Sequence, residues 1–368
     1  MNIDRRSMLG ILGGSALAPT KIVGAQAPEK KMGVALVGLG NYSEGELGPA
    51  LLKSKRARLT GLVSGSPAKI PKWREKYGVP EGNVYSYENF DEIASNREFD
   101  IVYVVLPPGL HAEYCIRAAK AGKHVICEKP MAATTAECDA MIAAAKEAKV
   151  SLHIGYRLHW DPYHLRMMEV AEKNELGVLT SIDTALGFVN THPDPKSWKM
   201  SKKLGIAGEL YNLGTYPVQA AIYIARQNPI RIKAKSHNAR PDIFVETAEG
   251  YEWEMDFPSG LKSTCFASAA KNGNFLKAAA TEGRFELDQA AFAYRNLGGH
   301  INGLKMDFPE VNQQALQIDG ICEAISNGVK SIVPAEMGRR DITILEAIMK
   351  SAETSAPVEL GDLGYGPV

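Results

Sequence analysis

The residues of this chain that could do chemistry stand directly after short apolar runs. They are Gly38-Leu39-Gly40-Asn41-Tyr42, Leu106-Pro107-Pro108-Gly109-Leu110-His111 and Glu128-Lys129. A glycine turn that opens a helix offers backbone N–H groups to a pyrophosphate. A lysine ammonium at the next strand end can polarise an oxygen and lower the pKa of a neighbouring acid. The glycine turn therefore indicates a dinucleotide site, and Glu128 and Lys129 stand at the edge of the sheet where its ligand would bind.

Four apolar runs must position these residues, and they predict buried parallel strands. The runs are 33–37, 59–63, 101–105 and 124–127. Helices are expected from the glycine turn to about Lys53 and from His111 to Lys120, the second ended by Gly122. Ligands bind beyond the carboxyl ends of such strands. Cofactor contacts are therefore expected at Gly38, Leu39, Gly40, Asn41, Tyr42 and Leu106. Ser43 replaces the usual third glycine, and a doubly wound domain without cofactor is the alternative.

The charge after the second run indicates which nucleotide binds. An NAD site places an acidic residue about 20 residues beyond the glycines, on the ribose 2′-hydroxyl. The window 47–74 holds no acid and seven basic residues, Lys53, Lys55, Arg56, Arg58, Lys69, Lys72 and Arg74. Ser64 and Lys69 stand where a 2′-phosphate would lie, and a hydroxyl and an ammonium suit it. NADP is thus favoured over NAD; the alternative is that these basic residues only coat solvated helix faces.

The segment Cys127-Glu128-Lys129-Pro130-Met131-Ala132 resembles the Glu-Lys-Pro signature of the Gfo/Idh/MocA oxidoreductase family. Further similar blocks are Leu62-Val63-Ser64-Gly65, Leu110-His111-Ala112-Glu113 and Ile154-Gly155-Tyr156-Arg157. The resemblance implies that Glu128 contacts the nicotinamide ribose and that Lys129 is a catalytic or substrate-orienting cation. It also implies cofactor contact for Arg157 and substrate contact for Tyr156. For His111, capping the helix that begins there and contacting the cofactor are both open.

The resemblance places a second catalytic cluster in Gly208–Tyr216. Many family members have Asp and His at the positions of Asn212 and Tyr216, which lie one helical turn apart. Tyr216 is the candidate for proton transfer, because a nearby Lys129 ammonium would favour the tyrosinate. Asn212 cannot take a proton as a carboxylate can, but it can position a sugar hydroxyl or Lys129. A core position is the alternative for Tyr216. Trp198 and Lys199 match a family loop that approaches the cofactor.

The fold class that follows is α/β. We expect an N-terminal NADP-binding Rossmann domain over residues 28–155 and a C-terminal α+β substrate and oligomerisation domain over 156–368. Alternating runs predict a large, mostly antiparallel open sheet in the second domain, with a hairpin at Phe257-Pro258-Ser259-Gly260. Tyr294 is a candidate to reach back toward the cofactor. The last helices, near 312–327 and 339–354, are candidates to pack on the Rossmann domain.

Composition excludes several classes of protein. The chain has 368 residues with 42 Lys+Arg against 42 Asp+Glu, so no basic excess points to nucleic acid. The 5 cysteines form no paired motif, so no metal site or disulfide framework is expected. Residues 1–27 carry Arg5-Arg6, an uncharged run of small and apolar residues and a small-residue end, the pattern of a twin-arginine signal cleaved after Ala25 or Ala27. A packed N-terminal helix is the alternative.

An exported nicotinamide enzyme acts where no soluble NADP(H) pool can be presumed. We therefore expect tightly bound NADP(H) in a periplasmic protein that the twin-arginine machinery exports. Its ping-pong cycle would oxidise an aldose at C1 to an aldonolactone and reduce a second aldose or ketose to an alditol. Three alternatives stay open: an NADP-dependent sugar dehydrogenase with exchangeable cofactor, a non-catalytic sugar sensor, and a less favoured NAD-dependent glycosidase. Only a few residues, about Pro28 to Met32, lie between the predicted signal and the first strand, so we expect a homodimer through the open sheet rather than an arm-stabilised tetramer.

Overall fold

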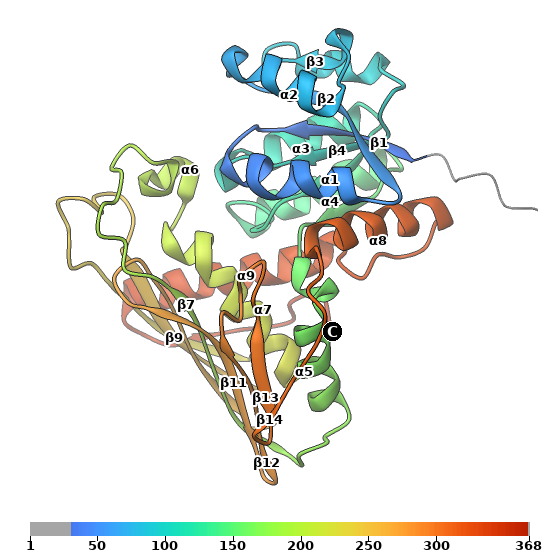
Figure 1. Cartoon of the computed structure of the whole chain (residues 1–368). Coiled ribbons are helices and arrows are strands. Elements are labelled where there is room, and N and C mark those ends of the chain that lie inside the picture. The colour runs from blue at the N-terminus through green and yellow to red at the C-terminus, as the bar shows by residue number, and fades with distance from the viewer. Residues whose placement is uncertain (1–30, 367–368) are drawn as a thin grey trace, which may run out of the picture. The chain divides into compact units, whose positions relative to one another are not determined.

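The computed structural model describes residues 31–366, so the predicted signal and its cleavage sites after Ala25 and Ala27 lie outside the described residues. Within that range the strands form a six-stranded and a nine-stranded sheet. Figure 1 shows the first sheet around β1, β2 and β4 and the second around β7, β9 and β11. No helix of residues 31–366 has the length and apolar character needed to cross a bilayer.

The six-stranded sheet is parallel and has the order β3-β2-β1-β4-β5-β6. Its strands are β1 (Met32–Val37), β2 (Ala57–Val63), β3 (Val84–Tyr85), β4 (Ile101–Val104), β5 (His124–Cys127) and β6 (Leu152–Ile154). The four predicted strands are confirmed, and all are largely buried because they consist of apolar residues. The strand order reverses between β1 and β4, where an open α/β sheet binds its ligand.

The helices connect these strands and continue through the second half of the chain. They are α1 (Gly48–Lys53), α2 (Ile70–Tyr77), α3 (His111–Lys120), α4 (Thr135–Glu147), α5 (Pro162–Glu172), α6 (Lys202–Gly205), α7 (Thr215–Ala225), α8 (Gln313–Asn327) and α9 (Ala335–Thr354). The helix α3 has the predicted bounds, and Gly122 follows it with φ of +74°. The helix α4 was missing from the prediction, although its start is capped: Thr134 Oγ1 accepts the Glu137 N–H over 3.2 Å, and Glu137 Oε2 accepts the Ala133 N–H over 2.9 Å.

The nine-stranded sheet has the order β14-β13-β12-β11-β7-β10-β9-β8-β15. Its strands are β7 (Leu179–Gly187), β8 (Arg231–His237), β9 (Gly250–Asp256), β10 (Lys262–Ser268), β11 (Gly273–Ala280), β12 (Gly283–Gln289), β13 (Gly298–Ile301), β14 (Leu304–Lys305) and β15 (Val358–Glu359). Only β7 and β10 pair in parallel, so the predicted mostly antiparallel sheet is confirmed.

The predicted hairpin joins β9 to β10, with Gly260 at φ of +85°. The strand β9 begins at Gly250, because the residues before it turn: the Phe244 N–H donates to the Arg240 carbonyl over 3.0 Å.

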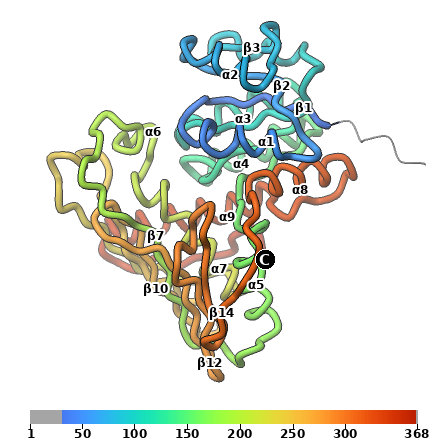
Figure 2. Tube along the Cα trace, viewed as in Figure 1, coloured from blue at the N-terminus to red at the C-terminus, as the bar shows by residue number. Residues whose placement is uncertain are grey.

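The last two long helices contact elements of the first sheet, as the chain trace in Figure 2 shows for α8 beside α1. Asp319 of α8 accepts backbone N–H bonds from Lys55 and Arg56 over 3.0 and 2.9 Å. Arg339 of α9 pairs with Asp139 of α4. These contacts hold α8 and α9 against the elements around the first sheet.

Candidate active site

A cavity of about 590 Å³ lies at the carboxyl ends of β1, β2, β4 and β5. Most of the predicted site residues line it, namely Gly38, Leu39, Gly40, Asn41, Tyr42, Ser64, Lys69, Leu106, Glu128, Lys129, Trp198, Lys199, Asn212 and Tyr216. Tyr294 lines it as well. The predicted residues His111, Tyr156 and Arg157 do not line it.

The turn after β1 is shaped for a pyrophosphate. Gly38 has φ of +94°, and a Cβ there would lie 2.5 Å from the Val105 carbonyl oxygen. The buried Ser43 hydroxyl donates to the Gly38 carbonyl over 2.6 Å, so the residue in the third glycine's place closes the turn. A Cβ on Gly40 would meet no atom within 4 Å, which leaves open space beside the turn. These residues fit a dinucleotide.

The end of β2 supplies hydroxyls and one ammonium. Ser64 Oγ accepts the Ser66 N–H over 3.1 Å, and Lys69 Nζ donates to the Leu39 carbonyl over 2.8 Å. Ser66 and Tyr87 also line the cavity and were not predicted, although Ser66 stands in the segment that suggested Ser64. Of the seven basic residues in the acid-free window, Lys69 is the one that lines the cavity.

The carboxylate of Glu128 is buried beneath the cavity. Its Oε1 accepts the Tyr103 hydroxyl over 2.7 Å, and its Oε2 accepts the Lys129 N–H over 3.2 Å. Burial raises the pKa of Glu128 despite these bonds. Gly155 leaves the space that the carboxylate fills, since a Cβ there would lie 2.6 Å from Oε1.

The phenol of Tyr216 lies between two cations. Lys129 Nζ is 4.5 Å from its ring centroid, and Arg157 Nε donates to its hydroxyl over 3.1 Å. Burial by itself raises the pKa of Tyr216, but Arg157 and then Lys129 lower it, and the result is a pKa below the ordinary tyrosine value. Arg157, which the sequence suggested for the cofactor, thus contacts the phenol directly.

Asn212 lies in η8 (Leu210–Gly214), a π-helical turn that runs into α7. Its backbone carbonyl accepts from Lys129 Nζ over 2.8 Å, so the main chain, not the amide, holds the ammonium. The side-chain Nδ2 donates to the buried Glu209 carboxylate over 2.7 Å. Glu209 was not predicted, because nothing in its spacing separates it from an ordinary helix residue.

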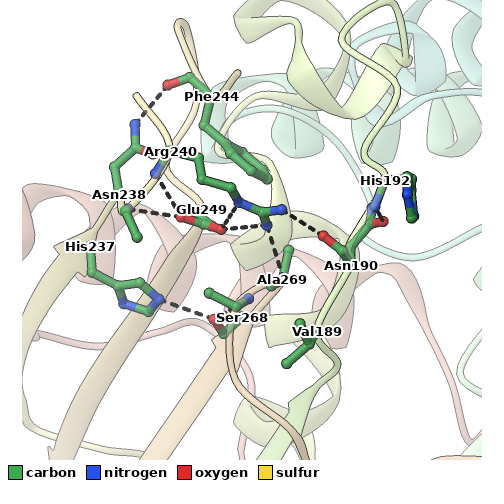
Figure 3. Close-up of polar contacts among 12 residues, drawn as sticks. Val189, Asn190, His192, His237, Asn238, Arg240, Phe244, Glu249, Ser268 and Ala269 are labelled. Atoms are coloured by element: carbon green, nitrogen blue, oxygen red, sulfur yellow. Dashed lines mark hydrogen bonds and ion pairs between the residues drawn. The ribbon is translucent and has the colours of Figure 1, made fainter. Parts of the chain in front are cut away.

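Trp198 and Lys199 stand on the segment 188–201 between β7 and α6. The close-up in Figure 3 shows the clamp that fixes its first part: Arg240 donates to the Asn190 and Ala269 carbonyls over 2.6 and 3.3 Å. The fully buried Glu249 carboxylate accepts from Arg240 Nε over 2.6 Å. The Arg240–Glu249 clamp therefore joins Asn190 after β7 and Ala269 after β10 to the residue that precedes β9.

The loop 239–249, which contains Arg240 and Glu249, also holds the end of the segment 188–201 and the start of α6. The Lys202 N–H donates to Glu246 over 2.7 Å, and Thr247 Oγ1 donates to the Lys199 carbonyl over 3.4 Å. The segment 239–249 therefore supports the residues that bring Trp198 and Lys199 to the cavity.

Two predicted residues outside the lining have structural surroundings. The His111 ring lies 2.9 Å from the Pro130 carbonyl and 2.7 Å from the Leu106 carbonyl, so it bridges the loops after β4 and β5. The suggested capping role of His111 is wrong, because no side chain caps the start of α3. Tyr156 is buried, and burial and the Asp341 carboxylate raise its pKa.

An ion pair and a ring contact join the glycine turn and the residues after it to the segment 290–297, and the two tyrosines of the ring contact line the cavity. Arg295 donates to both Glu46 oxygens over 3.0 and 2.9 Å, and the Tyr42 and Tyr294 rings lie 5.8 Å apart. We call these four residues the clasp. The sequence suggested Tyr294 but not the Glu46–Arg295 pair.

Comparison with known proteins identifies the family. Residues 32–156 match the oxidoreductase family with an NAD-binding Rossmann fold, and residues 164–287 match the GFO/IDH/MocA C-terminal domain. The aldose-aldose oxidoreductase structure from Caulobacter crescentus, complexed with glycerol, is 35% identical with a TM-score of 0.86, covering 90% of this chain and 100% of that one. The D-xylose 1-dehydrogenase [NADP(+)] of Haloarcula marismortui is 23% identical over 91% of this chain and 94% of its own length.

A more distant structure shares the fold. It is a 3-ketoreductase from Actinomadura kijaniata in complex with NADP and TDP-benzene, 20% identical, with a TM-score of 0.77 over 88% of this chain and 98% of that one. The two family matches together span more than half of the residues. The chain belongs to the Gfo/Idh/MocA family of oxidoreductases.

Proposed function

We propose that this protein is a sugar oxidoreductase that keeps NADP(H) bound while it oxidises a cyclic aldose at C1 and reduces a second aldose or ketose to an alditol. The observation that carries the proposal is the phenol of Tyr216 between Lys129 and Arg157 in the cavity beside the glycine turn. The likeness to the aldose-aldose oxidoreductase supports the two-sugar cycle. When bound, the nicotinamide supplies the hydride acceptor of one half-reaction and the hydride donor of the other.

The chain's own residues hold the proton and the sugar. Tyr216 Oη takes the C1 hydroxyl proton as the aldose becomes an aldonolactone, and it returns a proton to the carbonyl oxygen of the second sugar. Lys129, fixed by the Asn212 carbonyl, lies where its charge stabilises the reacting oxygen. Glu128 and the glycine turn would hold the nicotinamide ribose and the pyrophosphate.

The ionisation of Tyr216 gives the reaction a pH dependence. Its pKa lies below the ordinary value because two cations outweigh its burial. Aldose oxidation should therefore accelerate as the pH rises through that lowered pKa. Tyr216→Phe should abolish this dependence along with turnover, and stopped-flow rates across pH measure it. A rate that stays level as the pH rises would contradict the role of Tyr216.

Retention of the cofactor is supported by the clasp and by the segment 188–201, which both border the cavity. The Ser64, Ser66 and Lys69 group favours a 2′-phosphate, hence NADP. A conventional sugar dehydrogenase with exchangeable cofactor is the second candidate, because the D-xylose 1-dehydrogenase matches most of the chain.

One incubation separates these functions. Purified protein is incubated with one aldose and no added cofactor, and the products are analysed, with Lys129→Ala as the control. Equimolar aldonic acid and alditol support the two-sugar cycle. Product that appears only when NADP is added identifies the dehydrogenase, and no product under either condition supports a sugar sensor.

We further propose that the protein is exported to the periplasm by the twin-arginine machinery and that it forms a homodimer through the open sheet. Charged residues pair across the strands of that sheet, as Lys235 does with Glu252 over 3.0 Å and Lys262 with Asp256 over 3.2 Å. Cell fractionation of wild type and an Arg5→Lys/Arg6→Lys variant tests export. Light scattering of the purified protein tests the dimer.

A further inference from the structure

Arg157 is a buried cation with an unusual set of partners. It lies in η6 (Arg157–Trp160), directly after β6, and is 1% exposed. Its Nη1 donates to the Ala293 carbonyl over 3.0 Å and to Gln313 Oε1, and its Nη2 donates to the Phe292 carbonyl over 2.6 Å. Its remaining bond goes from Nε to Tyr216. None of the hydrogen-bond partners that the described chain gives this guanidinium is a carboxylate.

A buried charge normally needs a counter-ion, since desolvation costs several kcal/mol per ion. Glu128 interacts with the guanidinium through space, and the carboxylate to which the hydrogen bonds of Arg157 lead is Asp161, which a neutral amide separates from the guanidinium. Gln313 Nε2 donates to Asp161 Oδ2 over 2.8 Å, and Asp161 Oδ1 accepts from the backbone N–H and Nδ1 of His164 over 3.0 and 2.9 Å. Gln313, Asp161 and His164 are each at most 2% exposed.

The direction of the hydrogen bonds that run from Arg157 through Gln313 to Asp161 is fixed by the chemistry of Arg157 and Asp161. A guanidinium only donates and a carboxylate only accepts, so the Gln313 amide has one orientation. A carboxylate in place of Gln313 would pair directly with Arg157 and neutralise it. The Gln313 amide holds the guanidinium in place without neutralising it, so the positive charge of Arg157 acts on Tyr216.

We infer that Arg157 acts in the reaction as the cation that holds the Tyr216 oxygen while this oxygen takes or returns a proton, and that Gln313 and Asp161 are positioning residues for Arg157. The inference rests on the proposed function, because it requires Tyr216 to transfer the proton. The other charged or titratable groups that face Tyr216 are Lys129, Glu128, Tyr42 and Tyr294. Lys129 favours the phenolate and Glu128 opposes it, whereas Tyr216 itself raises the pKa of Tyr42 and of Tyr294, so Lys129 is the one cation of this set that is left if Arg157 is lost.

Gln313→Met tests the positioning role, because it removes both amide bonds and changes no charge. Single-turnover aldose oxidation by the holoenzyme is measured across pH, and tyrosine ionisation is followed by ultraviolet difference titration with Tyr216→Phe as reference. We expect the rising limb and the Tyr216 titration to move up together by about one pH unit, with a rate loss of roughly tenfold below the limb. Gln314→Met is the matched control, since Gln314 is the next residue of α8, is 1% exposed and lies outside this chain of bonds. It should leave both curves in place.

Three further variants test the direction of the pKa change and keep the inference testable if Gln313→Met does not fold. Asp161→Asn removes a negative charge, so a purely through-space effect would lower the Tyr216 pKa, whereas loss of positioning raises it. Arg157→Lys keeps the charge but not the fork, and it should recover part of the rate that Arg157→Met loses, even if Gln313→Met does not fold.

The outcomes separate this inference from the proposed function. An unmoved limb in Gln313→Met, an equal shift in Gln314→Met, or a lowered pKa in Asp161→Asn would overturn the inference. Absence of aldose oxidation by the wild-type protein would instead refute the proposed function. In that case the ultraviolet titration still decides whether Gln313 and Arg157 control the ionisation of Tyr216.

Discussion

Replacing Gly155 by alanine should weaken cofactor binding without disturbing the fold. The new Cβ would lie 2.6 Å from Glu128 Oε1 and 3.0 Å from its Cδ, whereas ordinary contact begins at 3.4 Å. The carboxylate must therefore move by roughly 0.8 Å, the difference between 3.4 and 2.6 Å. A shift of that size lengthens its 2.7 Å bond from the Tyr103 hydroxyl to as much as about 3.5 Å, well beyond the range of about 2.5–3.0 Å for O–H···O bonds.

The expected magnitude follows from the bond that Glu128 would make to the nicotinamide ribose. A hydrogen bond to a charged group contributes about 1.5–3 kcal/mol. Losing one corresponds to roughly a 10- to 150-fold weaker affinity for NADP(H). The clash concerns one side chain, so the thermal midpoint of the apoprotein should change far less than the cofactor affinity.

Fluorescence titration of the apoprotein with NADPH measures the affinity, and calorimetry measures the thermal midpoint. Gly82→Ala is the matched control, because a Cβ at this exposed glycine would meet no atom within 4 Å. Equal NADPH affinity in Gly155→Ala and wild type would refute the assignment of Glu128 to the cofactor. Equal loss in both variants would show that the effect is not specific to the carboxylate.

Three further predictions concern Lys69 in the cavity lining and two sets of contacts, the clasp and the clamp, that hold segments of the lining. Lys69→Glu should weaken NADP binding by roughly 10- to 100-fold and NAD binding much less, because a carboxylate repels the 2′-phosphate; equal losses in calorimetric titrations would contradict this. Reversing either charge of the partly exposed Glu46–Arg295 pair should speed NADPH release about two- to fivefold, measured by transfer to a scavenging dehydrogenase, and the double reversal should restore it. Glu249→Ala should lower the free energy of unfolding by about 1–3 kcal/mol, because it leaves the partly buried Arg240 without its carboxylate partner; an unchanged urea midpoint would count against the clamp.

The strand ends of the first sheet could be predicted because local sequence determines them. Apolar runs specify buried strands, and the residue after each run must lie at the sheet's carboxyl edge. Glu128 and Lys129 reach the cavity for that reason, and so does the glycine turn. The strands of the second sheet were harder to predict, since β13 and β14 are short and partly exposed.

The contacts between distant segments could not be predicted, because no local pattern encodes them. Gln313 lies 156 positions from Arg157, and Arg295 lies 249 positions from Glu46. Each of these residues is unremarkable in its own segment, and only the packing of α8 and the 290–297 segment brings it to the site. The contact of Arg157 with Tyr216 could not be predicted for the same reason, because the neighbours of Arg157 in the sequence say nothing of Tyr216.

Asn212 and Arg157 together explain how one tyrosine could carry the proton chemistry alone. A carboxylate at position 212 would raise the pKa of the phenol one turn away, as Glu128 already does. The amide removes that repulsion, and its side chain turns to Glu209 instead. Because position 212 carries no carboxylate, the charges of Arg157 and Lys129 lower the pKa of Tyr216 by more than burial and Glu128 raise it. A site of this kind needs no carboxylic acid as proton donor, since a tyrosine whose pKa lies nearer to neutrality can both accept and return the proton.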